Sequence, residues 1–222
     1  MPLNRTLAKA ALRARLTATV FATTGSIALA ATTTGYTRES GSFLDDGFAP
    51  GMEVTPAGFN ANAVDVISTV SALEIKTVNV HGAQSVGNNR SLSVLLPRNR
   101  AFDGRQEQLT PGIPAVKEAY VQAGSRLLSI TPEGGTETNE AAYIVTLFVP
   151  TSYGDQALDR MATTIERRFS SGTAVSSGGQ TLVVRHNPGP FSGQVLPSAT
   201  PGFVYCLITV PLRASLRASR VA

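Results

Sequence analysis

Cysteine is almost absent from this 222-residue chain, in which Cys206 is the single one. One cysteine cannot form an intramolecular disulfide, and two histidines, His81 and His186, are too few for a Cys/His zinc site. Charged residues make up only 15% of the chain, against about 25% in an average soluble protein. Disulfide scaffolds and zinc modules are therefore excluded, and 42% hydrophobic residues exclude a disordered chain.

Long apolar runs are also missing. The most apolar segments are residues 91–97, 143–149 and 206–212, whereas a helix that crosses a bilayer needs about 20 apolar residues in succession. The sequence therefore predicts no membrane-spanning helix and no membrane partner. Segments of this length are typical of β-strands.

Turn-forming residues are abundant, with 20 glycines and 13 prolines. Between residues 25 and 97 they separate short apolar segments at residues 26–31, 64–70, 73–80 and 92–96. Short strands at such spacing are typical of a small barrel or sandwich. We therefore expect an all-β unit here.

The N-terminal segment allows two interpretations. Ala8, Leu12, Leu16 and Val20 recur every four residues, which predicts an amphipathic helix over residues 4–20. The alternative is a secretory signal, because four basic residues precede a moderately apolar stretch that ends near residue 31. Polar residues inside that stretch favour the helix, and cleavage near residue 31 would favour the signal.

A second helix is expected after Asp155, which can cap it. Its apolar positions follow helical spacing and Gly172 lies where a helix end favours glycine. These positions are Leu158, Met161, Ala162, Ile165 and Phe169.

Strands are expected on both sides of that second helix. Residues 98–114 and 132–141 have loop composition, and the strand segments are residues 115–123, 127–131, 143–149, 173–175, 180–185 and 203–212. The predicted fold class is α+β, with helices packed on a mostly antiparallel sheet. Residues 1–20 and 99–222 would form one discontinuous domain, with residues 21–98 inserted as a small all-β barrel or sandwich domain.

Charge is unevenly distributed. Residues 21–98 carry four basic and six acidic residues, so this stretch is −2 and the remainder of the chain is +6. No acid follows Glu166 in the last 56 residues. Because no aromatic residues alternate with these basic residues, we expect a solvated or subunit-facing surface and no sequence-specific nucleic-acid binding.

Catalytic and metal-binding patterns are missing. The sequence contains no G-x-S-x-G motif, so His81 and His186 have no nucleophilic serine to activate. Asp45 and Asp46 lack the alternating oxygen ligands of a calcium-binding loop. Cys206 lies in an apolar strand segment, where burial makes a thiol unreactive. The N-x-S/T sequons at Asn4 and Asn89 matter only in a glycosylating host. The sequence predicts no enzyme, catalytic residue, cofactor or metal site.

The order of segments in the C-terminal half is more informative. A strand at residues 143–149 leads to Tyr153-Gly154, the following helix ends in Arg168-Phe169, a turn-flanked strand runs from Gly172-Thr173 to Gly178-Gly179, and the last strand ends in Val210-Pro211-Leu212-Arg213-Ala214. This order resembles that of the tail terminator proteins of long-tailed bacteriophages. Residues 4–20 would match the first helix of that family. Residues 41–79 resemble a small β-domain appended to other phage tail and neck proteins.

The resemblance implies a structural virion protein assembled in the bacterial host cytoplasm. It would form a homo-oligomeric ring, typically a hexamer, that ends polymerisation of the tail tube at its head-proximal end. Its partners would be the tail tube protein and the head–tail connector or stopper protein, with loops at residues 98–114, 132–142 and 186–202 contacting neighbours. The alternatives are another neck, head-completion, tail tube or baseplate protein. A secreted β-rich binding protein with a signal peptide is the alternative from a different class.

Overall fold

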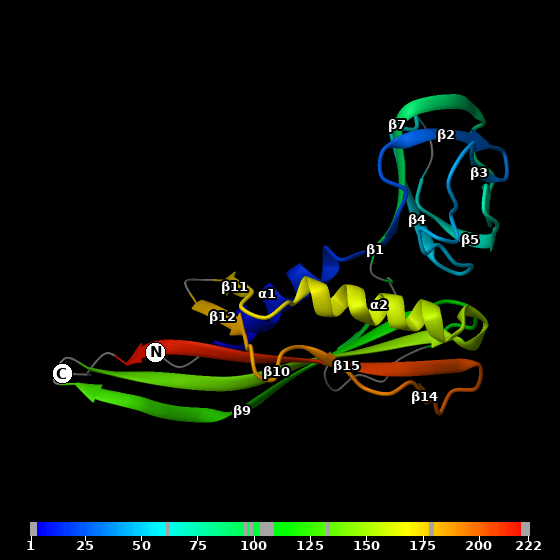
Figure 1. The fold of residues 1–222 in the computed structure, drawn as a ribbon. Coiled ribbons are helices and arrows are strands. Elements are labelled where there is room, and N and C mark those ends of the chain that lie inside the picture. Colours follow the sequence, from blue (N-terminus) through cyan, green and yellow to red (C-terminus); the bar gives the residue numbers. More distant parts are fainter. Residues whose placement is uncertain are drawn as a thin grey trace.

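The protein is predominantly β (Figure 1). The computed structural model describes residues 4–60, 63–95, 97, 100–102, 109–131, 134–177 and 180–218. In these residues there are two α-helices, of 13 and 14 residues, against fifteen strands. The α+β prediction is therefore wrong: the chain forms a closed six-stranded barrel and a second, largely antiparallel sheet.

The barrel closes because β7 pairs with both ends of the strand order β7-β2-β3-β6-β5-β4. Its strands are all antiparallel: β2 (Ile27–Thr32), β3 (Gly35–Arg38), β4 (Glu53–Ala57), β5 (Asp65–Val70), β6 (Glu74–Thr77) and β7 (Gln84–Leu95). Strand β1 (Val20–Thr23) pairs with β7 as a further strand. Leu29, Tyr36 and Ile75 are fully buried in the barrel strands, as expected where alternate residues point inward.

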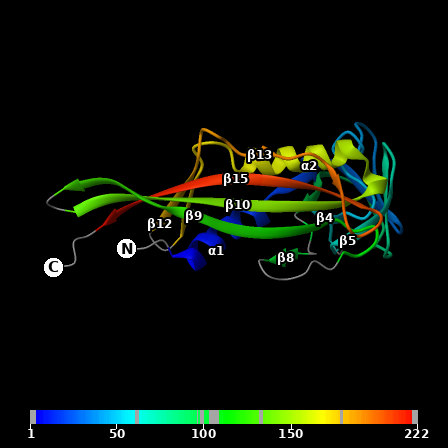
Figure 2. The same cartoon turned by 90° about the horizontal axis from the view of Figure 1, so that it is seen from below.

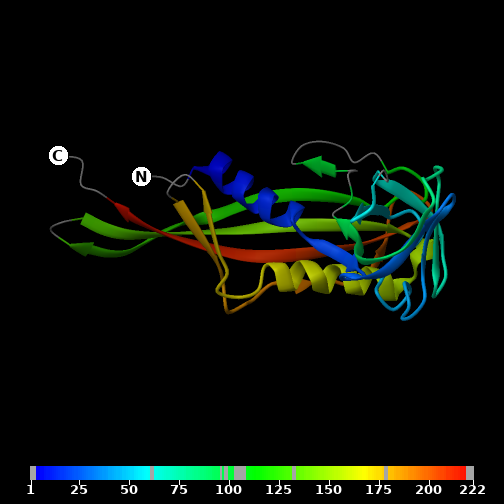
Figure 3. The same cartoon turned by 90° about the horizontal axis from the view of Figure 1, so that it is seen from above.

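The second sheet has the order β11-β12-β15-β10-β9-β8, with β13 and β14 also pairing to β15. Its strands are β8 (Arg100–Phe102), β9 (Ala115–Thr131), β10 (Gly134–Pro150), β11 (Ala174–Ser177), β12 (Gln180–Val184), β13 (Phe191–Ser192), β14 (Leu196–Pro197) and β15 (Phe203–Ala218). Only the β8–β9 pair is parallel among the described strands. The three long strands β9, β10 and β15 make a narrow, extended ribbon (Figure 3).

Two sequence predictions fail in this ribbon. Residues 132–141 were expected to be a loop, yet β10 begins at Gly134, and β9 continues without a break through residues 124–126. The reason is pairing: β10 is hydrogen-bonded to β9 on one side and to β15 on the other along almost its whole length. The polar composition of this segment gives no alternating apolar pattern from which the strand can be recognised.

Both helices lie on the same side of the second sheet (Figures 1 and 3). Helix α1 (Arg5–Thr17) confirms the predicted amphipathic helix, because its buried residues are Ala8, Leu12 and Leu16. It ends at Thr17, so the prediction is wrong at its C-terminal end: Val20 is the first residue of β1 and is 40% exposed. Cleavage near residue 31 would remove this packed helix together with β1 and most of β2.

Helix α2 (Asp155–Arg168) confirms the second predicted helix but not its cap. Gly154 occupies the N-cap position with φ 73°, so Asp155 is the first helical residue. Gly172 has φ 80° and its N–H donates to the carbonyl of Val184, which leads the chain from the helix into the β11–β12 hairpin. Neither described helix is both long and apolar enough to span a bilayer.

The barrel and the second sheet share one continuous cluster of buried side chains. At their junction Gly51 has φ 83°, and a Cβ there would lie 1.9 Å from the carbonyl oxygen of Gly112. Glycine is therefore required for this close approach. The division into residues 1–20 plus 99–222 and an insert at residues 21–98 stays a prediction about folding units.

The N-cap of α1 gives a first testable prediction. Asn4 Oδ1 accepts hydrogen bonds from the N–H groups of Thr6 at 3.0 Å and Leu7 at 3.2 Å. Replacing Asn4 with alanine is expected to lower the free energy of unfolding by about 1 kcal/mol, whereas Asn4→Ser should preserve most of it. Urea unfolding checks this, and equal midpoints for Asn4→Ala and the unmodified protein would contradict it.

Candidate interaction surface

The helices cover one side of the second sheet, and the other side is covered only at one end, where Ala115, Phe148 and Phe203 are buried against the partly buried Leu109. Tyr143, Val145 and Leu147 of β10 are almost completely buried on the helix side. Because strand residues alternate between faces, Ala142 and Ile144 point to the opposite side. In the described part of the chain no helix or sheet covers that side (Figure 2), and we call it the open face.

Cross-strand register shows which residues share the open face. Ile144 of β10 pairs with Ala119 of β9 and Thr209 of β15, and Phe191 of β13 pairs with Thr209 on the far side. Directly paired residues point to the same face of a sheet. These four paired residues form one row across the open face, with one residue from each of β9, β10, β15 and β13.

Large apolar side chains in the neighbouring rows are exposed. Each belongs to the open face by its register with β10 or β15, and each is 38–49% exposed: Val121, Val183, Phe191, Leu196 and Leu207. Scattered exposed side chains of this kind are ordinary, but several on one sheet face mark a surface for another molecule. The open face is therefore the candidate interaction surface.

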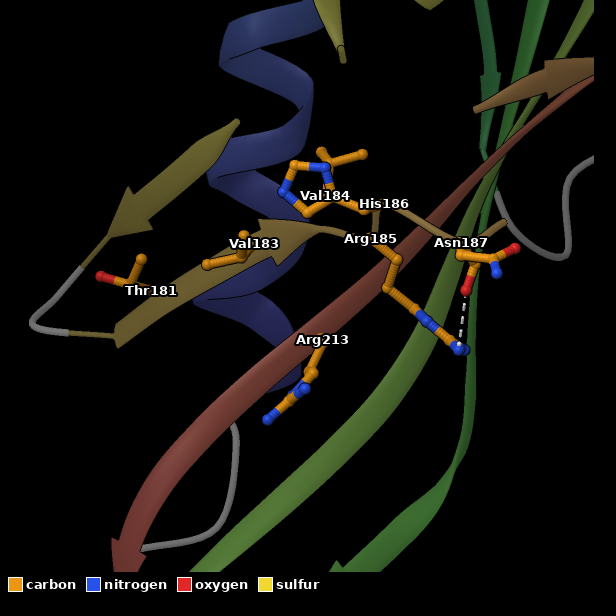
Figure 4. A pocket seen from close by; sticks show the side chains of 7 residues that line it. All are labelled: Thr181, Val183, Val184, Arg185, His186, Asn187 and Arg213. Carbon is orange, nitrogen blue, oxygen red and sulfur yellow. Dashed lines mark hydrogen bonds between the residues drawn. The ribbon is translucent and has the colours of Figure 1, made fainter. Parts of the chain in front are cut away.

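A basic cavity lies where the open face reaches the β11–β12 hairpin (Figure 4). It encloses about 540 Å³ and is lined by Thr181, Val183, Val184, Arg185, His186, Asn187 and Arg213. Arg185 lies 3.4 Å from the carboxylate of Glu140 and also donates to the carbonyl of Asn187 at 3.2 Å. Arg213 is exposed and forms no ion pair with any described residue.

His81, the first histidine considered for chemistry, is buried in the barrel. Its Nε2 lies 3.2 Å from Asp65 Oδ2, and no serine or second acid completes a catalytic arrangement there among the described contacts. Asp65 also accepts hydrogen bonds from the N–H groups of Val66 and Asn79 and from the Asn79 side chain. This pair ties the start of β5 to the segment after β6.

The same contacts set the acid dependence of the barrel. Burial raises the pKa of Asp65, but the hydrogen bonds from Asn79 and Val66 outweigh it, so the pKa lies below its usual range. A depressed carboxyl pKa contributes stability that is complete above about pH 4 and is lost as the pH falls through the folded-state pKa.

We expect Asp65→Asn to remove this part of the pH dependence. Urea unfolding measured at about pH 5 and at about pH 3 should show a smaller loss of stability for Asp65→Asn than for the unmodified protein. Asp159→Asn, which alters an exposed carboxylate on α2, is the control and should follow the unmodified protein. Parallel curves for all three proteins would contradict the assignment.

His186 and Cys206, the other candidates for catalysis, pack against neighbouring residues. His186 lies against Gly172, where a Cβ would come within 3.1 Å of its ring, and it lines the basic cavity. Cys206 is buried in β15, and burial raises the pKa of its thiol, which makes it a poor nucleophile. Its Sγ lies 3.3 Å from the carbonyl oxygen of Gly193.

Asp45 and Asp46 do not act as a pair. Asp46 forms an ion pair with Arg38, whose guanidinium lies 5.0 Å from the ring centroid of Phe43, whereas the Asp45 N–H donates to Ser42 Oγ. Asp46 therefore has a structural role beyond solvating a turn. Among the residues placed by the structure, no three His, Cys, Asp or Glu side chains cluster as metal ligands. The absence of enzymatic, cofactor and metal chemistry stays a prediction.

The two sequons lie in different settings. Asn4 caps α1, whereas Asn89 is exposed in β7 with φ 64°.

The basic N-terminus is less available than the sequence indicates. Arg13 lies 3.4 Å from the buried carboxylate of Glu118, and Arg15 donates to the carbonyl of Arg168 at 2.8 Å. Arg5 donates to Gln122 at 2.7 Å. These three arginines attach α1 to the sheet and to α2, while Arg5 is exposed, and the solvated or subunit-facing basic surface stays a prediction.

Comparison with known proteins adds no identity. No protein-family model and no curated protein sequence matches the chain. A solved structure with an uninformative name aligns with 55% of this chain and 81% of its own, at 17% identity and a TM-score of 0.41. A likeness that weak carries no conclusion about fold or function.

Sequence reasoning missed the open face. The segments at residues 143–149 and 203–212 are apolar at nearly every position, which is the available signal that both faces of these strands favour burial. Which side the helices leave uncovered depends on the packing of α1 and α2. The basic cavity was missed because its residues come from two strands that only the fold brings together.

Proposed function

We propose that this protein is a structural subunit that assembles through its open face into a ring. The open face is the observation that carries the proposal. Assembly interfaces bury apolar side chains at their centre, and Val121, Phe191 and Leu207 offer such side chains on one side of the sheet. Glu140, which is exposed at the end of this face, suits a polar rim.

We further propose that the ring is the tail terminator of a long-tailed bacteriophage. The order of segments over residues 100–222 supports this identity through its resemblance to that family. The resemblance implies six subunits, contacts with the tail tube protein and the head–tail connector or stopper protein, and a place in the virion. A head-to-tail interface forms a closed ring when the rotation per subunit divides a full turn.

The first experiment measures assembly directly. Light scattering coupled to size exclusion and negative-stain electron microscopy of the purified protein, alone and with tail tubes, should show a ring of six copies. A ring once per particle supports a terminator, whereas many stacked rings would assign the protein to the tail tube. A protein that stays monomeric at high concentration and on tubes contradicts the proposal.

The second experiment tests the biological role. Deleting the gene from the phage should give tails of uncontrolled length that fail to join heads. Normal tail length with joined heads would exclude a terminator even if the purified protein forms rings.

A further inference from the structure

Strands β12 and β15 enclose a wedge beside the basic cavity (Figure 4). In the described residues they pair at Val183 with Arg213 and at Val184 with Leu212, and the Arg185 N–H just after β12 donates to the carbonyl of Pro211. Strand β12 begins at Gln180 and β15 continues to Ala218, so the two strands diverge on that side. We call this gap, between residues 180–182 and residues 214–218, the wedge.

The backbone of β15 presents a free edge to the wedge. The carbonyl of Pro211 accepts from the N–H of Arg185 at 2.9 Å, so the backbone groups of Pro211 point toward β12. Backbone direction alternates along a strand, and the groups of Ser215 and Arg217 therefore point the same way. Strand β10 pairs with the other edge of β15, and no described strand pairs with residues 214–218 from the wedge side.

Two arginines, Arg185 and Arg213, lie at the wedge with one carboxylate, Glu140, which is the cross-strand partner of Arg213 and lies 3.4 Å from Arg185. Arg213 is exposed at its apex without an ion pair among the described residues, and the last 56 residues contain no acid. Arginine binds carboxylates with directed, charge-assisted hydrogen bonds. Thr181 and Asn187 add polar groups to the cavity next to it, and no Phe, Tyr or Trp is among the described residues that line it.

We propose that the wedge binds an extended acidic segment of a partner protein. The segment adds as a strand to the free edge of β15, and a carboxylate on its open-face side pairs with Arg213. Main-chain hydrogen bonds to Ser215 and Arg217 supply affinity, and Arg213 selects for acid. This inference goes beyond the proposed ring and does not depend on it.

The test uses a fluorescein-labelled peptide of sequence TEVEVEVET and the matched peptide TQVQVQVQT. Fluorescence anisotropy should show binding of the acidic peptide, and at least about tenfold weaker binding of the glutamine peptide. Arg213→Ala should weaken binding of the acidic peptide by about tenfold. Arg167→Ala, which removes an exposed arginine on α2, is the matched control and should bind like the unmodified protein.

A backbone variant separates strand addition from simple charge attraction. Ser215→Pro removes an N–H that points into the wedge and leaves the β10–β15 hydrogen bonds, as Pro211 already does in the same strand. We expect this variant to lose about tenfold or more in affinity with an unchanged circular dichroism spectrum. If Ser215→Pro does not fold, Arg217→Pro is measured instead, because it removes the next N–H along the same edge.

Several outcomes overturn the proposal. These are no binding by the unmodified protein, unchanged binding by Arg213→Ala, or unchanged binding by both proline variants. A single-stranded DNA oligonucleotide is the competitor. If it displaces the peptide and binds Ser215→Pro as tightly as the unmodified protein, the wedge binds phosphate groups instead of an acidic strand. Size exclusion of the same samples tests the ring separately. If no ring forms but the peptide still binds, only the proposed assembly is contradicted. If self-association is lost in Ser215→Pro and in no other variant, the edge of β15 binds a second copy of this chain instead of a partner protein.

Discussion

Replacing Leu207 with glutamate is expected to convert the assembled protein into monomers. Leu207 is in the first third of β15, and it is 38% exposed on the open face. If the open face is buried between subunits, a carboxylate there loses its hydration without gaining a partner. Such a change costs several kcal/mol, which corresponds to association weakened by about 100-fold or more.

The monomer itself should keep its fold in this experiment. Leu207 is partly exposed, so a polar replacement leaves the helix-side core of Val145 and Leu147 intact. The matched control is Leu73→Glu, which changes a leucine that is 47% exposed in the barrel. Light scattering should give a monomer for Leu207→Glu and the assembled mass for Leu73→Glu.

Two results would contradict an interface at the open face. One is full assembly of Leu207→Glu. The other is loss of assembly in Leu73→Glu with Leu207→Glu unaffected, which would move the interface to the barrel.

The second large effect is expected at Glu118. This carboxylate is 1% exposed beneath α1, where its Oε2 accepts a hydrogen bond from the hydroxyl of Tyr143 at 2.6 Å and lies 3.4 Å from Nε of Arg13. Burial and the neighbouring carboxylate both raise the pKa of the Tyr143 hydroxyl, which keeps it protonated and able to donate.

We expect Glu118→Ala to lower the free energy of unfolding by about 3 kcal/mol. The change leaves the buried Tyr143 hydroxyl without its acceptor, removes the ion pair with Arg13, and opens a small cavity. Glu118→Gln keeps an acceptor for Tyr143 and should cost about 1 kcal/mol. Urea unfolding followed by circular dichroism measures both values.

A double-mutant cycle identifies the interaction responsible. Tyr143→Phe removes the donor, so its effect and that of Glu118→Ala should be less than additive when combined. Additive losses, or equal stability of Glu118→Ala and the unmodified protein, would show that this buried contact contributes little.

The helices were predictable because each carries its own apolar stripe. Ala8, Leu12 and Leu16 in α1, and Leu158 and Ile165 in α2, recur at helical spacing and are buried as that spacing predicts. The cap of α2 was not predictable in the same way, because Asp155 suits both the cap and the first turn. The backbone of Gly154, with φ 73°, decides between them.

The long ribbon was only partly predictable. The apolar cores of β10 and β15 have strand composition, but their extensions toward residue 134 and residue 218 are polar and small. These extensions are strands because each finds a partner in register over its length, and pairing between residues far apart in sequence leaves no local signal. For the same reason an α+β fold was expected where the chain forms a barrel and a β-ribbon.

Composition and residue order alone determined that this chain has a single cysteine and no long apolar run, and they predict no Cys/His zinc site. The order of residues along the chain also predicted the two amphipathic helices, since their apolar pattern is local. Tertiary structure alone decided which sheet face the helices leave uncovered and that Arg13 lies beside the buried carboxylate of Glu118. It also decided that Arg213 lies at the edge of β15 with no ion pair to any described residue. Register and helix docking fix these three features, and both depend on contacts between residues more than a hundred positions apart in part of the fold.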